Sequence, residues 1–210
     1  MKIHINKSGL ALAEALMAVA LLAVGAIIMG TVVQSGISST RAAKEYLLAQ
    51  NLVTEGIESV KNIRNTNWLR NPLEPECWLN LNPSETVVCS ELAIYQTVDP
   101  AIEYNYISQE QENGLWILSA VTGNVSLNLE ESGGNTIYQL YLIKEEAGGG
   151  QSFMKYTTST DGEVSPYYRS VEFIYADYDM AIFEVKVQWE SESKTKTIAR
   201  QVQIFNYYNP

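Results

Sequence analysis

The sequence has 210 residues, of which 46% are hydrophobic and 10% aromatic, with 24 acidic and 14 basic side chains. This composition is typical of one folded domain of ordinary size with an appendage, and it argues against a chain that is disordered throughout. From residue 71 onward 20 acidic residues outnumber 7 basic ones, so the general surface there should repel phosphate backbones, and nucleic-acid binding is not expected.

The first predicted element is an apolar segment behind a short basic leader. Lys2 and Lys7 precede it, and residues 15–40 contain no charged side chain. About 20 apolar residues suffice to cross a hydrocarbon core, and the basic leader favours a cytoplasmic N-terminus. The sequence therefore predicts a single-pass segment in the cytoplasmic (inner) membrane with the remainder exported. A cleaved secretory signal peptide fits poorly, because the run is long and the small residues near Ser35 form a weak cleavage site.

Glu14 is the exception in this segment, because a carboxylate in lipid is costly unless it is paired. In the stretch KSGLALAE, Gly9 precedes the hydrophobic Leu10, and Glu14 is fifth counting from Leu10. This pattern resembles the type III signal of the type IV pilin superfamily, which includes pilins and type II secretion pseudopilins. Leu10 stands where Phe is common and Ala11 where Thr is common. A plain signal anchor would need no glutamate here.

The resemblance implies that a prepilin peptidase cleaves after Gly9 and that Leu10, the new N-terminal residue, is N-methylated. It also implies that Glu14 pairs with a positively charged N-terminal amine, of its own chain or of a neighbouring subunit, and so acts as a subunit-assembly contact. The alternative is that Glu14 lies at the headgroup boundary, where a negative charge near the start of a helix is mildly favourable.

The helix is expected to continue past the apolar run, to about residue 65. Good helix formers dominate this stretch, and no proline occurs before Pro72. Apolar residues recur at helical spacing and form a stripe whose main expected role is core packing: Leu48, Leu52, Ile57, Val60 and Ile63. The stretch AQNLVTEGIESVKNIRNTNW also resembles the helix of PilV-type minor pilins.

Residues 67–103 are expected to form an irregular connection, because prolines and asparagines are dense there. Cys77 and Cys89 lie in this exported region, where a disulfide between them would close a small loop; two free thiols are the alternative. Two cysteines are too few for a four-ligand zinc site of their own.

From Tyr104 onward the pattern changes to strands. Seven stretches rich in β-branched and aromatic residues are expected to form a mostly antiparallel sheet whose inner face packs on the helix stripe: LWILSAV, VSLNL, TIYQLYLIK, FMKYTTS, RSVEFIYADY, AIFEVKVQWES and TIARQVQIFNYY. The expected class is α+β. By resemblance it is a pilin-like lollipop, with a leader (1–9), a transmembrane and filament-core helix (10–35), its amphipathic second half (36–66), a loop with the disulfide (67–103) and a β-sheet head (104–210).

No catalytic constellation stands out in the sequence. The only histidine, His4, lies in the leader, so a processed chain would have no Ser–His or Cys–His pair, and no P-loop or G-x-S-x-G motif occurs. The stretches 160–163 and 177–179 could suggest calcium loops, but they fit turns first, and calcium binding stays open. The tyrosines of the strand region are expected to fill or flank the core. Neither an enzyme nor a cofactor is expected.

The function predicted from these observations is that of a prepilin processed after Gly9 and assembled as a minor structural subunit of a type IV pilus or a pilus-like secretion filament, at the cell surface or in the periplasm. The expected partners are a prepilin peptidase, other pilin or pseudopilin subunits and, before assembly, the cytoplasmic membrane. The alternatives are a major pilin, a signal-anchored exported surface protein that does not polymerise, and an exported enzyme.

Overall fold

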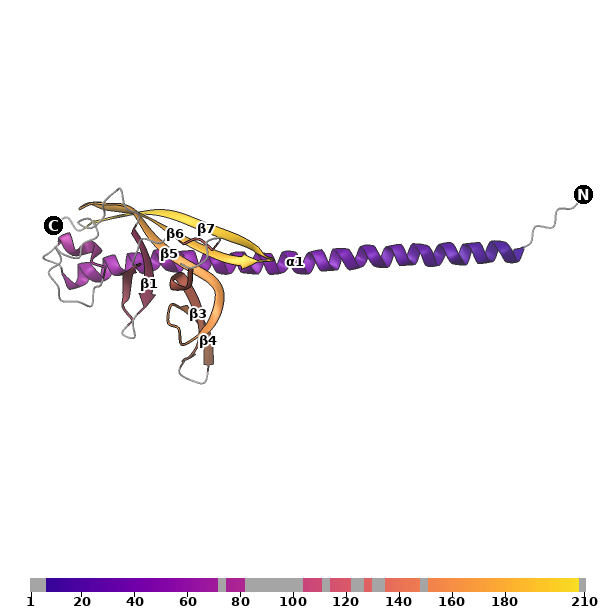
Figure 1. Ribbon diagram of the computed structural model, residues 1–210, viewed down its shortest axis with the longest axis horizontal. Helices are drawn as coiled ribbons and strands as arrows, with labels where there is room; N and C mark the ends of the chain where they lie inside the picture. The colour runs from indigo at the N-terminus through magenta and orange to yellow at the C-terminus, as the bar shows by residue number, and fades with distance from the viewer. Residues whose placement is uncertain are drawn as a thin grey trace, which may run out of the picture. The chain divides into compact units, whose positions relative to one another are not determined.

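The structure, a computed structural model, describes residues 7–71, 75–81, 104–110, 114–121, 127–129, 135–147 and 151–207. The described elements in chain order are α1 (Lys7–Arg70), η1 (Pro75–Leu79), β1 (Tyr104–Glu110), β2 (Trp116–Ala120), η3 (Asn135–Tyr138), β3 (Gln139–Ala147), β4 (Gln151–Thr157), β5 (Glu163–Ala176), β6 (Met180–Ser191) and β7 (Lys194–Phe205). One long N-terminal helix followed by an antiparallel sheet confirms the expected α+β class (Figure 1). The chain divides into two compact units, Met1–Tyr46 and Leu47–Pro210.

The helix α1 extends beyond both of its expected ends, since it begins at Lys7 and ends at Arg70. Its last turn is closed by the Asn71 N–H, which donates to the Asn67 carbonyl at 2.9 Å. Asn71 precedes a proline, and a residue in that position is disfavoured in the helical region, so the helix stops there. The end expected from the sequence, about residue 65, is too early. The Asn and Thr residues near it have low helix propensity, but tertiary contacts outweigh propensity here. One such contact joins Trp68 Nε1 to Asn206 Oδ1 at 3.1 Å.

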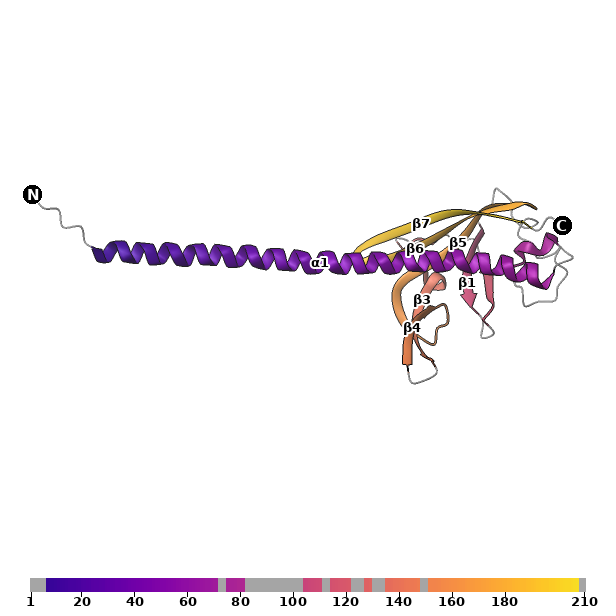
Figure 2. The same ribbon diagram turned by 180° about the vertical axis from the view of Figure 1, so that it is seen from behind.

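The strands form one antiparallel sheet built around β5. Along one path the order is β2-β1-β5-β3-β4, while β6 pairs with β5 and β7 pairs with β6. β5 is long enough, at 14 residues, for β3 to pair near its start and β1 nearer its end. In both views of the ribbon, β5, β6 and β7 run alongside the C-terminal part of α1 (Figures 1 and 2).

Short polar turns connect the long strands. A tight hairpin joins β6 and β7, with Ser191 opposite Lys194 and two residues, Glu192 and Ser193, at φ of 52° and 61°. This conformation matches the two-residue turns whose twist suits antiparallel strands. At the β5–β6 turn, Asp177 Oδ1 accepts the backbone N–H groups of Asp179 and Met180 at 2.8 and 2.7 Å.

The core of the unit Leu47–Pro210 lies between the helix stripe and one face of the sheet. The predicted stripe is confirmed, because four of its five residues are at most 5% exposed, and Leu48 packs against the cluster as a half-buried residue. Apolar and polar residues alternate along β6, and the apolar face is buried: Ala181, Phe183, Val185, Val187 and Trp189. Of the tyrosines expected to fill or flank the core, Tyr106, Tyr138 and Tyr167 are at most 2% exposed and fill it, whereas Tyr207 is 72% exposed.

Two of the expected strands differ in the structure. Residues 127–129 of the stretch VSLNL form no strand, although Leu127 is buried at 2% exposure. The Leu129 N–H donates instead to the side chain of Gln188 at 3.0 Å, so a side chain takes the place of a neighbouring strand. The stretch TIYQLYLIK begins as the 3-10 helix η3, and the strand starts only at Gln139. Both stretches have strand-like composition, but pairing partners decide the outcome.

Candidate functional site

The first candidate site is the surface of α1 within the unit Met1–Tyr46. Large apolar side chains project from it with 54–74% of their surface exposed, and they occur on all sides of the helix: Leu12, Leu16, Met17, Val19, Leu21, Leu22, Val24, Ile27, Ile28, Met29, Val32, Val33 and Ile37. A helix that is apolar all round is ordinarily covered by lipid or by other helices. In the described part of the chain, α1 is the one helix long and apolar enough to cross a membrane.

Two hydroxyl groups inside this segment are satisfied by the helix itself. Thr31 Oγ1 donates to the Ile28 carbonyl at 2.8 Å, and Thr40 Oγ1 donates to the Gly36 carbonyl at 2.9 Å. Hydroxyl groups that bond to their own helix need no water. At the end of the segment Arg41 Nε forms an ion pair with Glu45 Oε1 at 3.2 Å, which marks the return to a polar surface.

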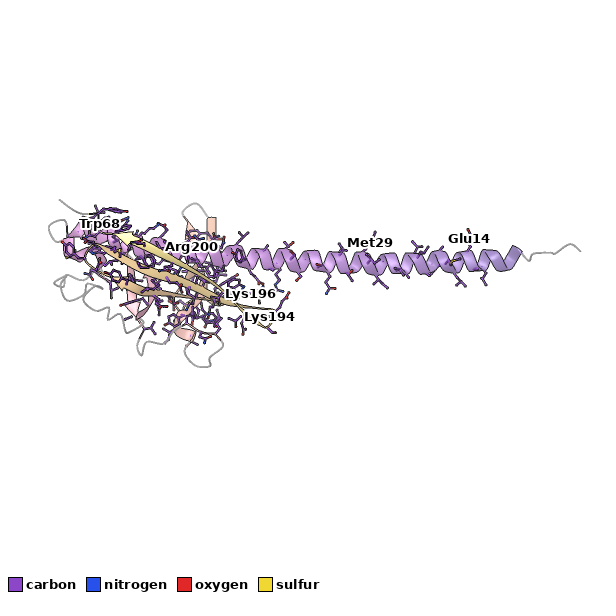
Figure 3. The ribbon with its side chains drawn as sticks, turned by 90° about the horizontal axis from the view of Figure 1, so that it is seen from above. Glu14, Met29, Trp68, Lys194, Lys196 and Arg200 are labelled. Carbon is purple, nitrogen blue, oxygen red and sulfur yellow. The ribbon has the colours of Figure 1, made fainter. Side chains whose placement is uncertain are left out.

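Glu14 does not fit this description, since it is exposed and projects from the apolar segment (Figure 3). It is the only charged residue in the sequence between Lys7 and Arg41. Among the residues described here, no side chain or backbone group pairs with its carboxylate. An ionised carboxylate at this place therefore requires either water or a partner from outside the described chain.

Gly9 and Leu10 lie in the first turn of α1, which begins at Lys7. The first backbone N–H groups of a helix have no partner within it, so the start of α1 is the part of the helix that opens most easily. The predicted cleavage and N-methylation of Leu10 stay predictions, as do the expected limits of the leader and of the membrane segment. Leu10 precedes Glu14 by four residues, and residues with this spacing lie on one face of a helix.

Cys77 is buried in η1 at 1% exposure and takes part in a disulfide bond. Its expected partner, Cys89, lies outside the described residues. The sequence patterns do not single out the polar residue that ties this segment to α1. The buried Asn67 donates through Nδ2 to the carbonyls of Trp78 and Asn80 at 3.2 and 3.0 Å. Its position still gives a signal for burial, because Asn67 continues the stripe at helical spacing after Ile63.

The two acidic stretches considered for calcium are turns. Ser159 Oγ donates to Asp161 Oδ2 at 2.9 Å, and Tyr175 donates its hydroxyl to Asp177 Oδ2 at 2.6 Å. The hydrogen bond from Tyr175 lowers the pKa of Asp177, with smaller contributions from the backbone N–H groups of the turn. Within the described ranges no three acidic, Cys or His residues come together as a metal site.

The chain matches no protein-family model, no curated protein and no solved structure in the three comparisons. Its class therefore rests on the molecule itself. It is an α+β protein with one N-terminal helix that can span a membrane, followed by an antiparallel sheet that packs on the C-terminal part of the same helix.

Proposed function

We propose that this chain is a prepilin-like subunit, cleaved after Gly9, held in the cytoplasmic membrane by α1 and assembled through that helix into a type IV pilus or a pilus-like secretion filament. Its role is structural and not enzymatic. The observation that carries the proposal is the exposed, predominantly apolar helix surface with Glu14 as its single charge between Lys7 and Arg41.

The reasoning starts from what Glu14 would cost in lipid. Placing a carboxylate at the centre of a membrane helix costs about 2.5–3.5 kcal/mol on insertion scales, and the cost falls when the charge is paired. Cleavage after Gly9 creates an ammonium group on Leu10, one helical turn before Glu14. The amine of a neighbouring subunit, placed one turn deeper or shallower, would neutralise this carboxylate and fix the register between two helices.

The rest of the helix surface suits the same role. Apolar side chains that are covered by lipid in a single subunit can be covered by equivalent helices in a filament. The partners on this proposal are a prepilin peptidase, other subunits of the same kind and the membrane before assembly. The PilV-type resemblance favours a minor subunit, because it extends into the part of α1 that packs on the sheet.

The first experiment expresses the full chain together with an active prepilin peptidase and determines the mature N-terminus by intact mass and N-terminal sequencing. We expect a chain that starts at Leu10 and carries one added methyl group. An intact Met1 terminus, with the peptidase active on a control prepilin, would leave a signal-anchored surface protein that does not polymerise as the better explanation.

The second experiment tests Glu14 with a matched control. The variants are Glu14→Gln and a double variant, Ala13→Glu with Glu14→Ala, which keeps the charge at nearly the same depth but turns it by about 100° around the helix. Both should still be cleaved, and both should lose site-specific crosslinking between subunits in the membrane. Unchanged crosslinking in the double variant would show that position 14 sets no register.

A further inference from the structure

The unit Leu47–Pro210 contains a polar cavity of about 350 Å³. Its walls come from α1, β1, β2, β3, β4 and β5, so elements far apart in the sequence converge there. A volume of this size lies within the range of roughly 300–1,000 Å³ that small-molecule sites occupy. The lining is unusual because side chains of both charges line it beside two aromatic rings.

The charges in the cavity are already paired with each other. Lys155 lies between Glu110 and Glu145, with Nζ bonded to Glu110 Oε2 and 3.4 Å from Glu145 Oε1. The hydrogen bond to Glu110 raises the pKa of Lys155, so the ammonium form is favoured. Three carboxylates and two cations line the cavity, and its net charge is therefore small. Such a site has no excess charge with which to select a strongly anionic or strongly cationic ligand.

Arg169 forms the second ion pair and is only 3% exposed. Its guanidinium donates to Glu55 Oε1 at 3.0 Å and to the carbonyls of Leu52 and Ser108 at 3.3 and 3.5 Å. These contacts hold the guanidinium between the helix and β1, and they fix one wall of the cavity. Paired carboxylates keep acceptor sites to spare, so the ion pairs do not exhaust the hydrogen bonding of the site.

One polar group in the wall has no partner. Ser108 is 2% exposed, it lines the cavity, and its hydroxyl oxygen makes no hydrogen bond within the described part of the molecule. Buried hydroxyl groups are nearly always satisfied in folded proteins, and a ligand is one of the explanations for an exception. A hydroxyl is both donor and acceptor, and it pairs well with another hydroxyl.

Trp116 extends the site in one direction. It lines the 350 Å³ cavity together with Glu55, and the same two residues also line a neighbouring hollow of about 200 Å³. The second hollow is bordered by polar side chains of α1, Ser59, Asn62 and Asn65, and by one residue of each charge, Glu58 and Lys61, which pair with each other. The half-buried indole therefore lies where two polar hollows meet, and it offers an apolar surface in an otherwise hydrogen-bonding site.

From this combination we propose that the two hollows bind a neutral oligosaccharide. A chain of sugar rings is elongated, uncharged and rich in hydroxyl groups that donate and accept, and it has an apolar C–H face that can pack on an aromatic ring. One ring would occupy the larger cavity and bond to the Lys155–Glu110 pair and, by a small shift of the wall that covers it, to the buried Ser108 hydroxyl. The next ring would pass over Trp116 toward Asn62. This site lies in the sheet-containing unit and is independent of the role proposed for the N-terminal segment.

The test uses the full chain in lipid nanodiscs, because maltoside and glucoside detergents would compete for the site. The probes are the neutral disaccharides maltose, cellobiose, lactose and di-N-acetylchitobiose, with glucosamine and glucuronate as charged comparators. Binding is measured by saturation-transfer NMR and by tryptophan fluorescence. We expect at least one neutral disaccharide to bind with a Kd of about 10 mM or lower, which is weak specific binding. Its Kd should be lower than that of either charged comparator.

The variants separate this site from nonspecific contact. Ser108→Ala should weaken binding roughly five-fold, the size of one neutral hydrogen bond. Trp116→Leu should abolish it, Trp116→Phe should retain part of it, and the exposed Ser152→Ala on β4 should leave it unchanged. Thermal unfolding of each variant confirms that the fold is intact. Three results would each overturn the proposal. They are no binding of any neutral probe, the same affinity in Ser108→Ala as in the wild type, and a charged comparator that binds more tightly than every neutral disaccharide.

Discussion

At Gly56 the helix α1 lies tightly against the sheet. A Cβ added at this residue would lie 2.7 Å from Val185 Cγ1 and 3.2 Å from Arg169 Cδ. Ordinary carbon contacts are about 3.5–4.0 Å, so an alanine here would require a displacement on the order of 1 Å. Val185 is fully buried on β6, and its branched side chain has little rotameric freedom. The strain cannot be relieved by turning one side chain.

The expected cost of Gly56→Ala follows from two opposing effects. Overpacking of a core costs typically about 1–3 kcal/mol, and the contact at 2.7 Å places this site in the upper part of that range. Replacing a glycine inside a helix by alanine recovers about 0.8–1 kcal/mol of helix propensity. The net result is a loss of about 1–2 kcal/mol in the free energy of unfolding, or a fall in melting temperature of roughly 2–8 °C for a unit of this size.

The assay is thermal and urea unfolding of the sheet-containing unit within the full chain, followed by near-UV circular dichroism. Gly36→Ala is the matched control, since nothing lies within 4 Å of a Cβ there and the unfolding of the sheet should not change. The double variant Gly56→Ala with Val185→Ala should lose less than the sum of the single losses, because the clashing methyl group is gone. A Gly56→Ala protein as stable as the wild type would refute this account of the helix–sheet contact.

Three further predictions concern the same unit. Glu55→Ala removes the ion-pair partner of buried Arg169 and should lower the free energy of unfolding by about 1–2 kcal/mol. This is less than the roughly 3–5 kcal/mol of a fully buried pair because Glu55 is 35% exposed, and urea midpoints measure it. Asn67→Ala leaves two carbonyls of the η1 segment without their donor and should cost about 2 kcal/mol by the same measurement. Burial, with a smaller contribution from Glu172, raises the pKa of Tyr138 to about 12, so this tyrosine ionises at lower pH in the unfolded chain than in the folded one. The free energy of unfolding should therefore fall as the pH rises from 10 to about 12. Tyr138→Phe should make that fall less steep.

The first two of these predictions have matched controls. Glu58→Ala breaks an exposed ion pair with Lys61 one turn further along α1 and should change stability by less than about 0.5 kcal/mol. Asn62→Ala alters an exposed asparagine of the same helix and should be nearly neutral. If either control costs as much as its buried counterpart, burial is not the source of the effect. An unchanged alkaline slope in Tyr138→Phe would assign the loss of stability to other tyrosines.

The elements with strong periodicity were predictable from the sequence. The stripe of α1 and the alternation of β6 repeat often enough that a shift of register would expose every apolar side chain at once, so one arrangement is favoured. Residues 127–129 lack such repetition. Their composition fits a strand equally well as a buried loop, and the side chain of Gln188, from a strand far along the chain, decided the outcome.

The polar residues of the interior were predictable in position but not in partnership. Arg169 occupies the same parity in β5 as the buried Tyr167, Val171 and Phe173, which marks it as an inward-facing charge. Nothing in the sequence indicates that Glu55, on α1, would meet it. Ser108 has the same limitation, since its wall of the cavity exists only after β1 has paired with both β2 and β5.

The contrast between the two units bears directly on the proposed function. In the unit Leu47–Pro210 the buried polar side chains Asn67 and Arg169 find partners in the same chain, whereas in Met1–Tyr46 thirteen large apolar side chains remain more than half exposed. A soluble monomer typically has a largest apolar patch of about 300–600 Å², so this surface has to be covered. Lipid and neighbouring helices cover it equally well, because transfer between them gains no hydrophobic energy. On the proposed function, Glu14 makes the difference between coverage by lipid and coverage by neighbouring helices, because its carboxylate is disfavoured in lipid and stabilised beside an amine. It therefore biases the subunit from the membrane toward the filament.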